Sequence, residues 1–319
     1  MKSSKPVIVY MGSADFAVPA LEAICDAGYE VPYVVTQPDR VRGRGGKVLS
    51  TPVGIFAGKK GLKLLKPDIL KDNEEFVKSL REAAPDLIVV AAYGKILPEL
   101  ILEIPPLGCV NIHASLLPEY RGAAPVQRAI LDGKRETGVT LMYMSKGLDS
   151  GDIIASAKTD ISGLNAGELT EVLAGLGAEL LLEKLPLITD GTAPRMPQDG
   201  TKATYADKIE KDEGYLSFDR TAEEIGLRVR AMTDAPGAYI MKDGEKIGVT
   251  RARALDPEEE SYEGKEESDP GTVLSVTKKG IAVRAKEGVV LIEAIRMPGR
   301  KAMPVAEYLK GNSFDAGSL

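Results

Sequence analysis

Asn111 and His113 are the residues whose types and spacing first indicate chemistry, because they stand two apart and His113 is the only histidine among 319 residues. If residues 109–113 form a strand, alternation places these polar side chains on one face of a sheet and Val110 and Ile112 on the other. A lone histidine can also be a buried imidazole with satisfied hydrogen bonds, and that alternative stays open. The paired asparagine favours a functional site that contains both residues.

The segment Ser115-Leu-Leu-Pro118 follows this predicted strand directly and ends it in a loop. In open α/β sheets, ligands bind at the loops that follow the carboxyl ends of the strands. A second polar position, Asp149, lies between Gly147 and Gly151, which allow tight turns. An aspartate in such a loop is either a turn-capping side chain or a member of the same site.

Residues 37–47 form a basic, glycine-rich stretch that contains Arg40, Arg42, Arg44 and Lys47. The stretch has no apolar periodicity, so we expect a loop. It is either a flexible solvated loop or a mobile basic finger that becomes ordered on phosphates, which arginine binds with a planar, bidentate fork. Composition alone supports both interpretations equally.

Alternating apolar runs and amphipathic segments predict the elements that position these residues. Parallel strands are expected at residues 7–11, 31–36 and 86–92, with helices at residues 18–27, 52–60 and 72–83. This order predicts an α/β fold with a Rossmann-like, mostly parallel sheet. Only Gly12 follows the first strand, so the Gly-x-Gly-x-x-Gly turn is absent and a nicotinamide cofactor is disfavoured.

The pattern changes at residues 194–209, a stretch rich in proline, glycine, aspartate, threonine and lysine that we expect to be a linker. Beyond it, short alternating strands separated by Asp-Gly, Lys-Gly and Glu-Gly turns predict a small antiparallel β-barrel of the OB-like kind. The predicted domains are therefore residues 1–193 and 210–319. The barrel either offers a face to an oligonucleotide or only packs against the first domain.

Composition narrows the classes of function. The net charge of −6 argues against a general nucleic-acid coat, so a polyanion would need local basic patches. Two cysteines and one histidine predict neither a disulfide framework nor a metal site. Neither a signal peptide nor an apolar stretch of about 18 residues is recognisable. We therefore expect a cytoplasmic protein without a membrane partner, and we expect a monomer.

Five motifs, in this order along the chain, resemble the folate-dependent formyltransferases: Asn111-Ile-His113, Ser115-Leu-Leu-Pro118, Arg121-Gly-Ala-Ala-Pro125, Glu136-Thr-Gly-Val-Thr140 and Gly147-Leu-Asp-Ser-Gly-Asp152. Thr36-Gln-Pro-Asp-Arg40, with the Gly-Arg-Gly that follows, is similar to the subgroup that formylates methionyl-tRNA. The resemblance covers essentially the whole chain, and several agreeing motifs make it more specific than any single one. The chain departs from it at Ala114 and Ser145, where family members often have glycine and an acid.

The resemblance implies roles for named residues. It implies a catalytic trio of Asn111, His113 and Asp149, and two substrates, 10-formyltetrahydrofolate and methionyl initiator tRNA. The pterin of the folate would lie against Ile96, Leu97, Ser115, Leu116, Leu117, Pro118, Gly147 and Leu148. The tRNA acceptor end would contact Arg40, Arg42, Arg44 and Lys47, among which Arg44 is best placed, and the barrel would support the tRNA.

Formyl transfer to an amine requires a stabilised tetrahedral oxyanion and the movement of one proton. Asn111 and a protonated His113 are donors for the oxyanion, and Asp149 can stabilise the charged ring and accept the proton directly or through water. No serine or cysteine has an adjacent base, so we expect direct transfer without a covalent enzyme intermediate. The competing hypotheses are a small-molecule formyltransferase or 10-formyltetrahydrofolate hydrolase, and a nucleic-acid-binding protein on a catalytically silent scaffold.

Overall fold

The structure of the protein is a computed structural model that describes residues 5–42, 46–256, 268–314, 317 and 319. The chain forms two units, and each collects stretches that are separated in sequence. The first unit combines residues 1–125 with 136–160 and 170–206, and the second combines 126–135 with 161–169 and 207–319. The domain boundaries at residues 193 and 210 remain a prediction.

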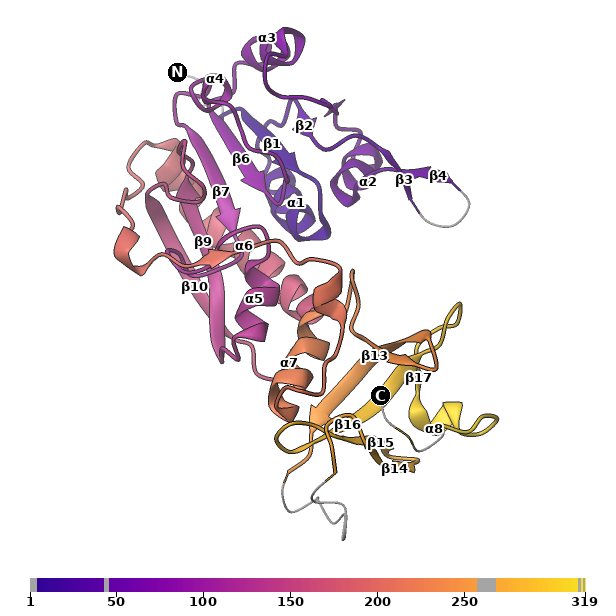
Figure 1. The fold of residues 1–319 in the computed structure, drawn as a ribbon. Coiled ribbons are helices and arrows are strands. Elements are labelled where there is room, and N and C mark those ends of the chain that lie inside the picture. The colour runs from indigo at the N-terminus through magenta and orange to yellow at the C-terminus, as the bar shows by residue number, and fades with distance from the viewer. Residues whose placement is uncertain (1–4, 43–45, 257–267, 315–316, 318) are drawn as a thin grey trace. The chain divides into compact units, whose positions relative to one another are not determined.

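The first unit is built on a seven-stranded sheet with the strand order β10-β9-β7-β6-β1-β2-β5 (Figure 1). Its strands are β1 (Ile8–Gly12), β2 (Val34–Val35), β5 (Leu64–Leu65), β6 (Leu87–Ala91), β7 (Cys109–His113), β9 (Glu136–Tyr143) and β10 (Ile153–Asp160). The strands from β5 to β7 are parallel, whereas β9 is antiparallel to both of its neighbours. Continuous apolar runs such as that of β6 suit strands buried on both faces, and the predicted mostly parallel sheet is confirmed.

Helices follow or precede these strands along the chain. They are α1 (Val18–Asp26), α2 (Pro52–Lys59), α3 (Glu74–Ala83), α4 (Glu99–Leu102), α5 (Pro125–Leu131) and α6 (Ala166–Thr189), with 3₁₀ turns η1 (Asp15–Ala17) and η2 (Gly200–Lys202). Thr51 caps α2 by accepting a hydrogen bond from Gly54 N at 3.0 Å, and Asn73 caps α3 in the same way. The apolar face of α3, with Phe76 and Leu80, is buried.

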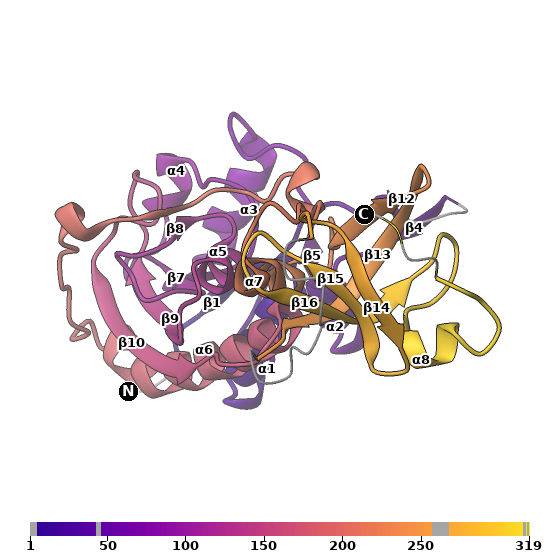
Figure 2. The same cartoon turned by 60° about the horizontal axis from the view of Figure 1, so that its bottom comes forward.

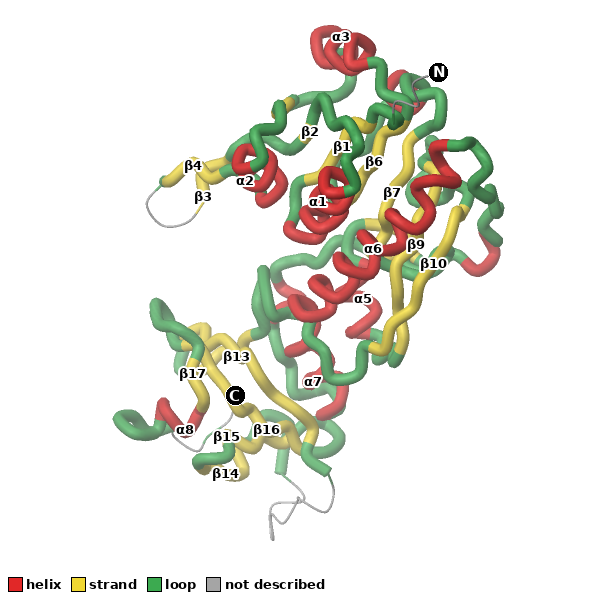
Figure 3. Tube along the Cα trace, turned by 180° about the vertical axis from the view of Figure 1, so that it is seen from behind, coloured by secondary structure: helices red, strands yellow, loops and turns green. Residues whose placement is uncertain are grey.

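Helix α6 covers the face of β7 that is turned away from Asn111 and His113. Figure 3 shows α6 lying over β7 and β9. The contact is close because Gly177 of α6 has no side chain, and a Cβ built on it would lie 2.8 Å from Ile112 Cγ2. Ile112 alternates with the two polar residues along β7, so their side chains point to the opposite face.

Two short ladders lie outside this sheet. β3 (Arg40–Arg42) and β4 (Lys47–Leu49) form an antiparallel hairpin, whereas the sequence predicted a loop for residues 37–47. Strands of three residues leave no periodicity to recognise, which is why pattern analysis missed them. β8 (Arg121–Gly122) pairs in parallel with β11 (Tyr205–Ala206), so residues of the predicted linker add a strand to the first unit.

The second unit contains an antiparallel sheet with the order β12-β13-β16-β15-β14, and β17 also pairs with β16 (Figure 2). Its elements are η3 (Asp212–Gly214), α7 (Ala222–Ala231), β12 (Tyr239–Lys242), β13 (Glu245–Ala254), β14 (Val273–Thr277), β15 (Gly280–Arg284), β16 (Val289–Arg296), β17 (Met303–Pro304) and α8 (Val305–Tyr308). The predicted small antiparallel domain is confirmed as a curved sheet, and among the described residues no pairing joins its edge strands β12 and β14. Helix α7 packs against β13 and begins with a capping box of Thr221 and Glu224.

Two glycines of α6 predict opposite outcomes for the same substitution. Gly177→Ala should push α6 away from Ile112, 2.8 Å from the new Cβ, and lower the free energy of unfolding by about 1–3 kcal/mol. A Cβ on Gly175 meets no atom within 4 Å, and Gly175→Ala should raise that free energy by up to about 1 kcal/mol because alanine favours helix. Guanidinium unfolding followed by circular dichroism measures both. Equal shifts of the same sign would show that α6 does not rest on Ile112.

Candidate active site

Strand β7 presents Asn111 and His113 on the face opposite α6. In the sheet, Asn111 lies level with Val90 of β6 and Met142 of β9, and His113 lies level with Thr140 of β9. His113 is 6% exposed, and Asn111 is half-buried. The strand predicted for this stretch is confirmed. Asn111 is paired with a strand on each side, and His113 is paired with β9.

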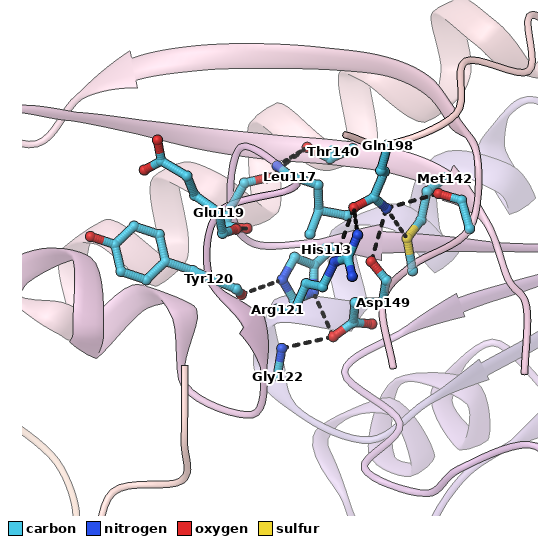
Figure 4. Close-up of polar contacts among 12 residues, drawn as sticks. His113, Leu117, Glu119, Tyr120, Arg121, Gly122, Thr140, Met142, Asp149 and Gln198 are labelled. Carbon is cyan, nitrogen blue, oxygen red and sulfur yellow. Dashed lines mark hydrogen bonds and ion pairs between the residues drawn. The ribbon is translucent and has the colours of Figure 1, made fainter. Parts of the chain in front are cut away.

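The contacts of His113 determine which ring nitrogen carries the hydrogen of the neutral ring (Figure 4). Its Nε2 lies 2.9 Å from the backbone carbonyl oxygen of Tyr120. Since a carbonyl oxygen only accepts hydrogen bonds, Nε2 carries a hydrogen in both the neutral and the charged ring. Nδ1 therefore carries no hydrogen in the neutral ring, and it faces Oδ2 of Asp149 at 3.7 Å. This distance permits an ion pair but is too long for a hydrogen bond, so a proton on Nδ1 stays available to a third group.

Asp149 is held beside His113 by a backbone hydrogen bond. Its Oδ2 accepts from Gly122 N at 2.9 Å, and its side chain is 16% exposed. The residue has a φ of 43°, in the left-handed region, as suits a turn between glycines. The sequence left open whether Asp149 caps a turn or joins the site, and its carboxylate lies in the same polar cluster as His113.

The loop that carries Asp149, residues 144–152, starts at the opposite end of β7 from His113. Because β9 is antiparallel to β7, Met144 N at the end of β9 donates to Cys109 O at the start of β7, at 2.8 Å. The loop then extends along β7 on the face that bears the polar side chains. The site thus occupies a face of the sheet as well as its carboxyl edge.

Asn111 contributes a different kind of group. Its side-chain amide makes no hydrogen bond within the described part of the chain, although the residue is half-buried. An amide with two N–H donors beside an imidazole and a carboxylate is suited to bind the oxygen of a substrate carbonyl. Together the three groups can stabilise an oxyanion and move a proton.

The Ser-Leu-Leu-Pro part of the predicted folate set forms a loop anchored on Thr140 of β9. The Thr140 hydroxyl donates to Ser115 O at 2.7 Å and accepts from Leu117 N at 3.0 Å. Ser115 and Leu117 are buried, whereas Leu116 and Pro118 are half-buried. Thr140 therefore fixes the backbone of the loop, and Leu116 and Pro118 leave part of their side-chain surface exposed to solvent.

The other predicted folate residues differ in their burial. Ile96 and Leu148 are large apolar side chains that are 85% and 55% exposed, and Gly147 beside Leu148 is also exposed. Leu97 is only 5% exposed and belongs to the core. Exposed apolar side chains on loops next to a polar cluster are typical of the walls of a ligand site. Leu97 instead packs into the core and anchors the loop that exposes Ile96.

The basic residues predicted to contact RNA concentrate on one hairpin. Arg40, Arg42 and Lys47 belong to the paired strands β3 and β4, and Arg40 is exposed. Arg44 lies outside the described residues. The structure therefore places three of the four residues on one small element of the first unit.

The base of this hairpin is anchored by neighbouring side chains. Lys66 Nζ donates to both carboxylate oxygens of Asp39 at 2.7 and 2.8 Å. This contact and a hydrogen bond from Ser50 hold the pKa of the Asp39 carboxyl below its usual range. The buried hydroxyls of Thr36 and Thr51 hydrogen-bond to each other at 2.5 Å and connect the two ends of the segment.

Several groups of the site were not found from the sequence. The carbonyl of Tyr120 and the N–H of Gly122 are backbone atoms, which carry no residue-type signal. Thr140 lies within a recognised motif but had no assigned role. Gln198 contacts the loop of residues 144–152 from within the predicted linker, where no periodic pattern marks it.

Neither Cys109 nor Ser115 is placed to act as a nucleophile. Cys109 is buried, and burial raises the pKa of its thiol to about 12. The Ser115 hydroxyl is buried and donates to Glu119 O at 2.6 Å. A neutral thiol and a hydroxyl used within its own loop are both poor nucleophiles.

Within residues 5–42, 46–256 and 268–314, with 317 and 319, no group of three or more histidine, cysteine, aspartate or glutamate side chains is arranged to hold a metal ion. In the same described part of the chain, no helix combines the length and the apolar composition needed to cross a membrane.

Known families and proteins match the chain over nearly its whole length. The family model described as formyl transferase matches residues 4–185, and the one described as formyl transferase, C-terminal domain, matches residues 208–313. Curated relatives include methionyl-tRNA formyltransferases from Acetivibrio thermocellus and Moorella thermoacetica, which are 43% and 44% identical over 313 residues. Each alignment covers 98% of this chain and 98% of the relative.

Solved structures share the fold at lower identity. WlaRD, a sugar 3N-formyl transferase, aligns with a TM-score of 0.65 and 18% identity over 93% of this chain and 99% of its own. HypX from Aquifex aeolicus, in complex with tetrahydrofolic acid, aligns with a TM-score of 0.61 and 18% identity. That alignment covers 96% of this chain but only 47% of HypX. At such identities the likeness shows the fold alone.

Cys109 provides a test of the burial of β7 beneath the site. Because its thiol is buried with a pKa of about 12, iodoacetamide at about pH 8 should leave it unmodified in the native protein. Cys25, which is partly exposed, should react first and serves as the internal control. Peptide mapping by mass spectrometry measures each thiol, and both should react in guanidinium. Native labelling of Cys109 as fast as that of Cys25 would contradict the buried strand.

Proposed function

The chain belongs to the formyltransferase family, and from that premise we propose that it transfers the formyl group of 10-formyltetrahydrofolate to the amino group of methionyl initiator tRNA. Similarity to methionyl-tRNA formyltransferases over 98% of the chain supports the acceptor. The observation that carries the chemistry is that Asn111 and His113 share one face of β7 and that Asp149 lies 3.7 Å from His113 on that face. We assign the catalytic role to this trio.

The trio provides donors for the oxyanion. The amine of the acceptor attacks the formyl carbon, and the carbonyl oxygen takes the negative charge of the tetrahedral intermediate. The Asn111 amide and a protonated His113 Nδ1 donate to this oxygen, and one such donor is typically worth about 3 kcal/mol. The hydrogen bond from Nε2 to Tyr120 O keeps Nδ1 turned towards Asp149.

Asp149 is the proposed acceptor of the proton. The attacking amine must lose one proton, and the departing folate nitrogen must gain one. The Asp149 carboxylate takes up the first proton directly or through water and passes it on to the departing folate nitrogen. At 3.7 Å it also stabilises the charged ring of His113. Because the Cys109 thiol and the Ser115 hydroxyl are both poor nucleophiles, the formyl group passes directly to the amine.

Loop residues on the same unit would hold the folate. Ile96 and Leu148 expose apolar surface, and Leu116 and Pro118 are half-buried in the loop after β7. Flat heterocycles bind against such side chains while a few polar groups fix their orientation. The buried members of the predicted set support these loops from the core.

The β3–β4 hairpin is the proposed contact with the tRNA acceptor end. Arg40, Arg42, Arg44 and Lys47 lie close together in the sequence, and the net charge of −6 means that RNA binding must come from such local patches. We assign support of the tRNA body to the second unit. Because charged tRNA is the acceptor, we place the reaction in the cytoplasm, and we propose that the chain acts as a monomer.

A formylation assay that offers charged initiator tRNA and charged elongator methionine tRNA in parallel tests this function. Formylation of the initiator tRNA alone supports both the reaction and the acceptor. Consumption of 10-formyltetrahydrofolate without transfer to either tRNA would indicate a hydrolase or a small-molecule formyltransferase. No consumption at all would indicate a catalytically silent binding protein.

Asp149→Asn keeps the size of the side chain and removes the proton acceptor. We expect kcat to fall by about 10²- to 10⁴-fold at saturating substrate, while thermal unfolding by circular dichroism stays unchanged. Asp152→Asn, in the same loop, is the matched control and should retain activity. Near-normal turnover of Asp149→Asn would show that Asp149 only caps a turn and does not accept the proton.

Arg40→Ala removes one exposed charge from the hairpin. We expect the KM for methionyl-tRNA to rise about 3- to 10-fold and the KM for 10-formyltetrahydrofolate to stay unchanged. If Arg40 neutralises one phosphate, log(kcat/KM) should fall less steeply with log salt in the variant, with a slope about 0.9 smaller in magnitude. Lys78→Ala, at an exposed lysine of α3, is the control. Unchanged kinetics for methionyl-tRNA across the salt titration would show that Arg40 does not contact the tRNA.

A further inference from the structure

We propose that Gln198 is a positioning residue for the Asp149 carboxylate, an inference that rests on the catalytic role proposed for Asp149. Gln198 lies within residues 194–209, the stretch that the sequence indicated as a linker. Its side chain connects two elements of the active site, the loop of residues 144–152 and strand β8 (Figure 4).

Both ends of the Gln198 amide are used. Nε2 donates to the carbonyl oxygens of Asp149 at 2.9 Å and of Gly151 at 2.8 Å. Oε1 accepts from Arg121 Nε at 3.1 Å and from Arg121 Nη2 at 2.7 Å. The reverse orientation would set an oxygen against two carbonyl oxygens and an NH2 group against a guanidinium. The neighbours therefore determine how the amide is turned.

Arg121 makes one end of this bridge rigid. It is 8% exposed, and among the described residues no carboxylate lies within ion-pair distance of its guanidinium. The buried guanidinium thus depends on Gln198 Oε1, and hydrogen bonds from a charged donor are roughly twice as strong as neutral ones. The Arg121 backbone is fixed as well, because its N–H donates to Thr204 O at 2.9 Å.

The backbone on both sides of Gln198 is also anchored. Met196 exchanges two hydrogen bonds with Ile153 at the start of β10, at 2.8 and 3.0 Å. Thr204 Oγ1 accepts from Tyr120 N at 2.8 Å. The segment therefore runs from β10 to β8, and Gln198 is held at a defined position between them.

This bridge sets the distance between the Asp149 loop and β8. Asp149 Oδ2 accepts from the N–H of Gly122, the residue after Arg121, at 2.9 Å. Asp149 has a φ of 43°, a conformation that a non-glycine residue keeps only when its surroundings hold it, and Gln198 holds its carbonyl. A displacement of about 1 Å in a catalytic group can reduce turnover about 100-fold.

Gln198→Glu is the sharpest test, because it keeps the size and the acceptor for Arg121 but replaces the donating NH2 group by an oxygen. We expect kcat for methionyl-tRNA formylation to fall about 10- to 100-fold, with both KM values within about threefold of the parent enzyme. Gln198→Ala removes both ends of the bridge and should act in the same direction. Thermal unfolding by circular dichroism checks that each variant is folded.

Asp199→Ala is the matched control on the same segment. The Asp199 carboxylate caps the next turn by accepting from Thr201 and makes no contact with the Asp149 loop. Its kcat should equal that of the parent. A loss in Asp199→Ala as large as in Gln198→Ala would show that any change in this segment impairs the enzyme, and it would overturn the specific role of Gln198.

A double-mutant comparison separates positioning from a general structural effect. If Gln198 acts through Asp149, adding Gln198→Ala to Asp149→Asn should reduce kcat by less than about threefold further, because the group being positioned is already lost. If the fold-losses in kcat of the two single variants multiply in the double variant, the inference is overturned. Unchanged kcat in folded Gln198 variants would also overturn it.

The same measurements keep this inference apart from the proposed function. Full activity of Asp149→Asn would contradict the catalytic role of Asp149 itself, and the positioning role would fall with it. Impaired Asp149→Asn beside fully active Gln198 variants would contradict only the positioning role.

Discussion

The hydrogen bond between His113 Nε2 and the carbonyl oxygen of Tyr120 is the constraint on which the rest of the site depends. It fixes the position of one ring hydrogen on Nε2 and keeps Nδ1 turned towards Asp149. Tyr120 has a φ of 59°, and its N–H is bound by the hydroxyl of Thr204. The orientation of the histidine therefore depends on backbone geometry and on a residue of the predicted linker.

The antiparallel direction of β9 explains how the three polar groups come together. If β9 were parallel to β7, the loop after it would begin beside His113 at the carboxyl edge of the sheet. Instead, the loop begins beside Cys109 and extends along β7, so Asp149 approaches the face that carries Asn111 and His113. Because β9 runs antiparallel to β7, the site includes one face of the sheet as well as its carboxyl edge.

The parts of this structure that could be predicted from the sequence are those that depend on local pattern. Alternation along residues 109–113 placed Asn111 and His113 on one face, and apolar runs marked the parallel sheet. The pairing of His113 with Asp149 came from the resemblance, since no local pattern connects them. Ile96 and Leu97 are adjacent apolar residues, and only the chain path shows that the first is exposed and the second is core.

Contacts made by backbone atoms and by the predicted linker could not be found from the sequence. Tyr120 O and Gly122 N act through groups that every residue shares, so residue types give no signal for them. Gln198 has its role because the chain returns past β8, and that path is set by tertiary pairing. The β3–β4 hairpin was missed because its strands are too short for a period to appear.

The pairing of β8 with β11 has a consequence for the order in which a newly made chain acquires its site. A nascent polypeptide that has reached residue 193 already contains Asn111, His113 and Asp149. At that length β8 has no strand to pair with, and the buried guanidinium of Arg121 has no acceptor at Gln198. Synthesis therefore delivers the three proposed catalytic side chains well before it delivers Gln198 and Thr204, which contact their neighbours. The ribosome must extend the chain through Ala206 before the candidate site has all the contacts described above.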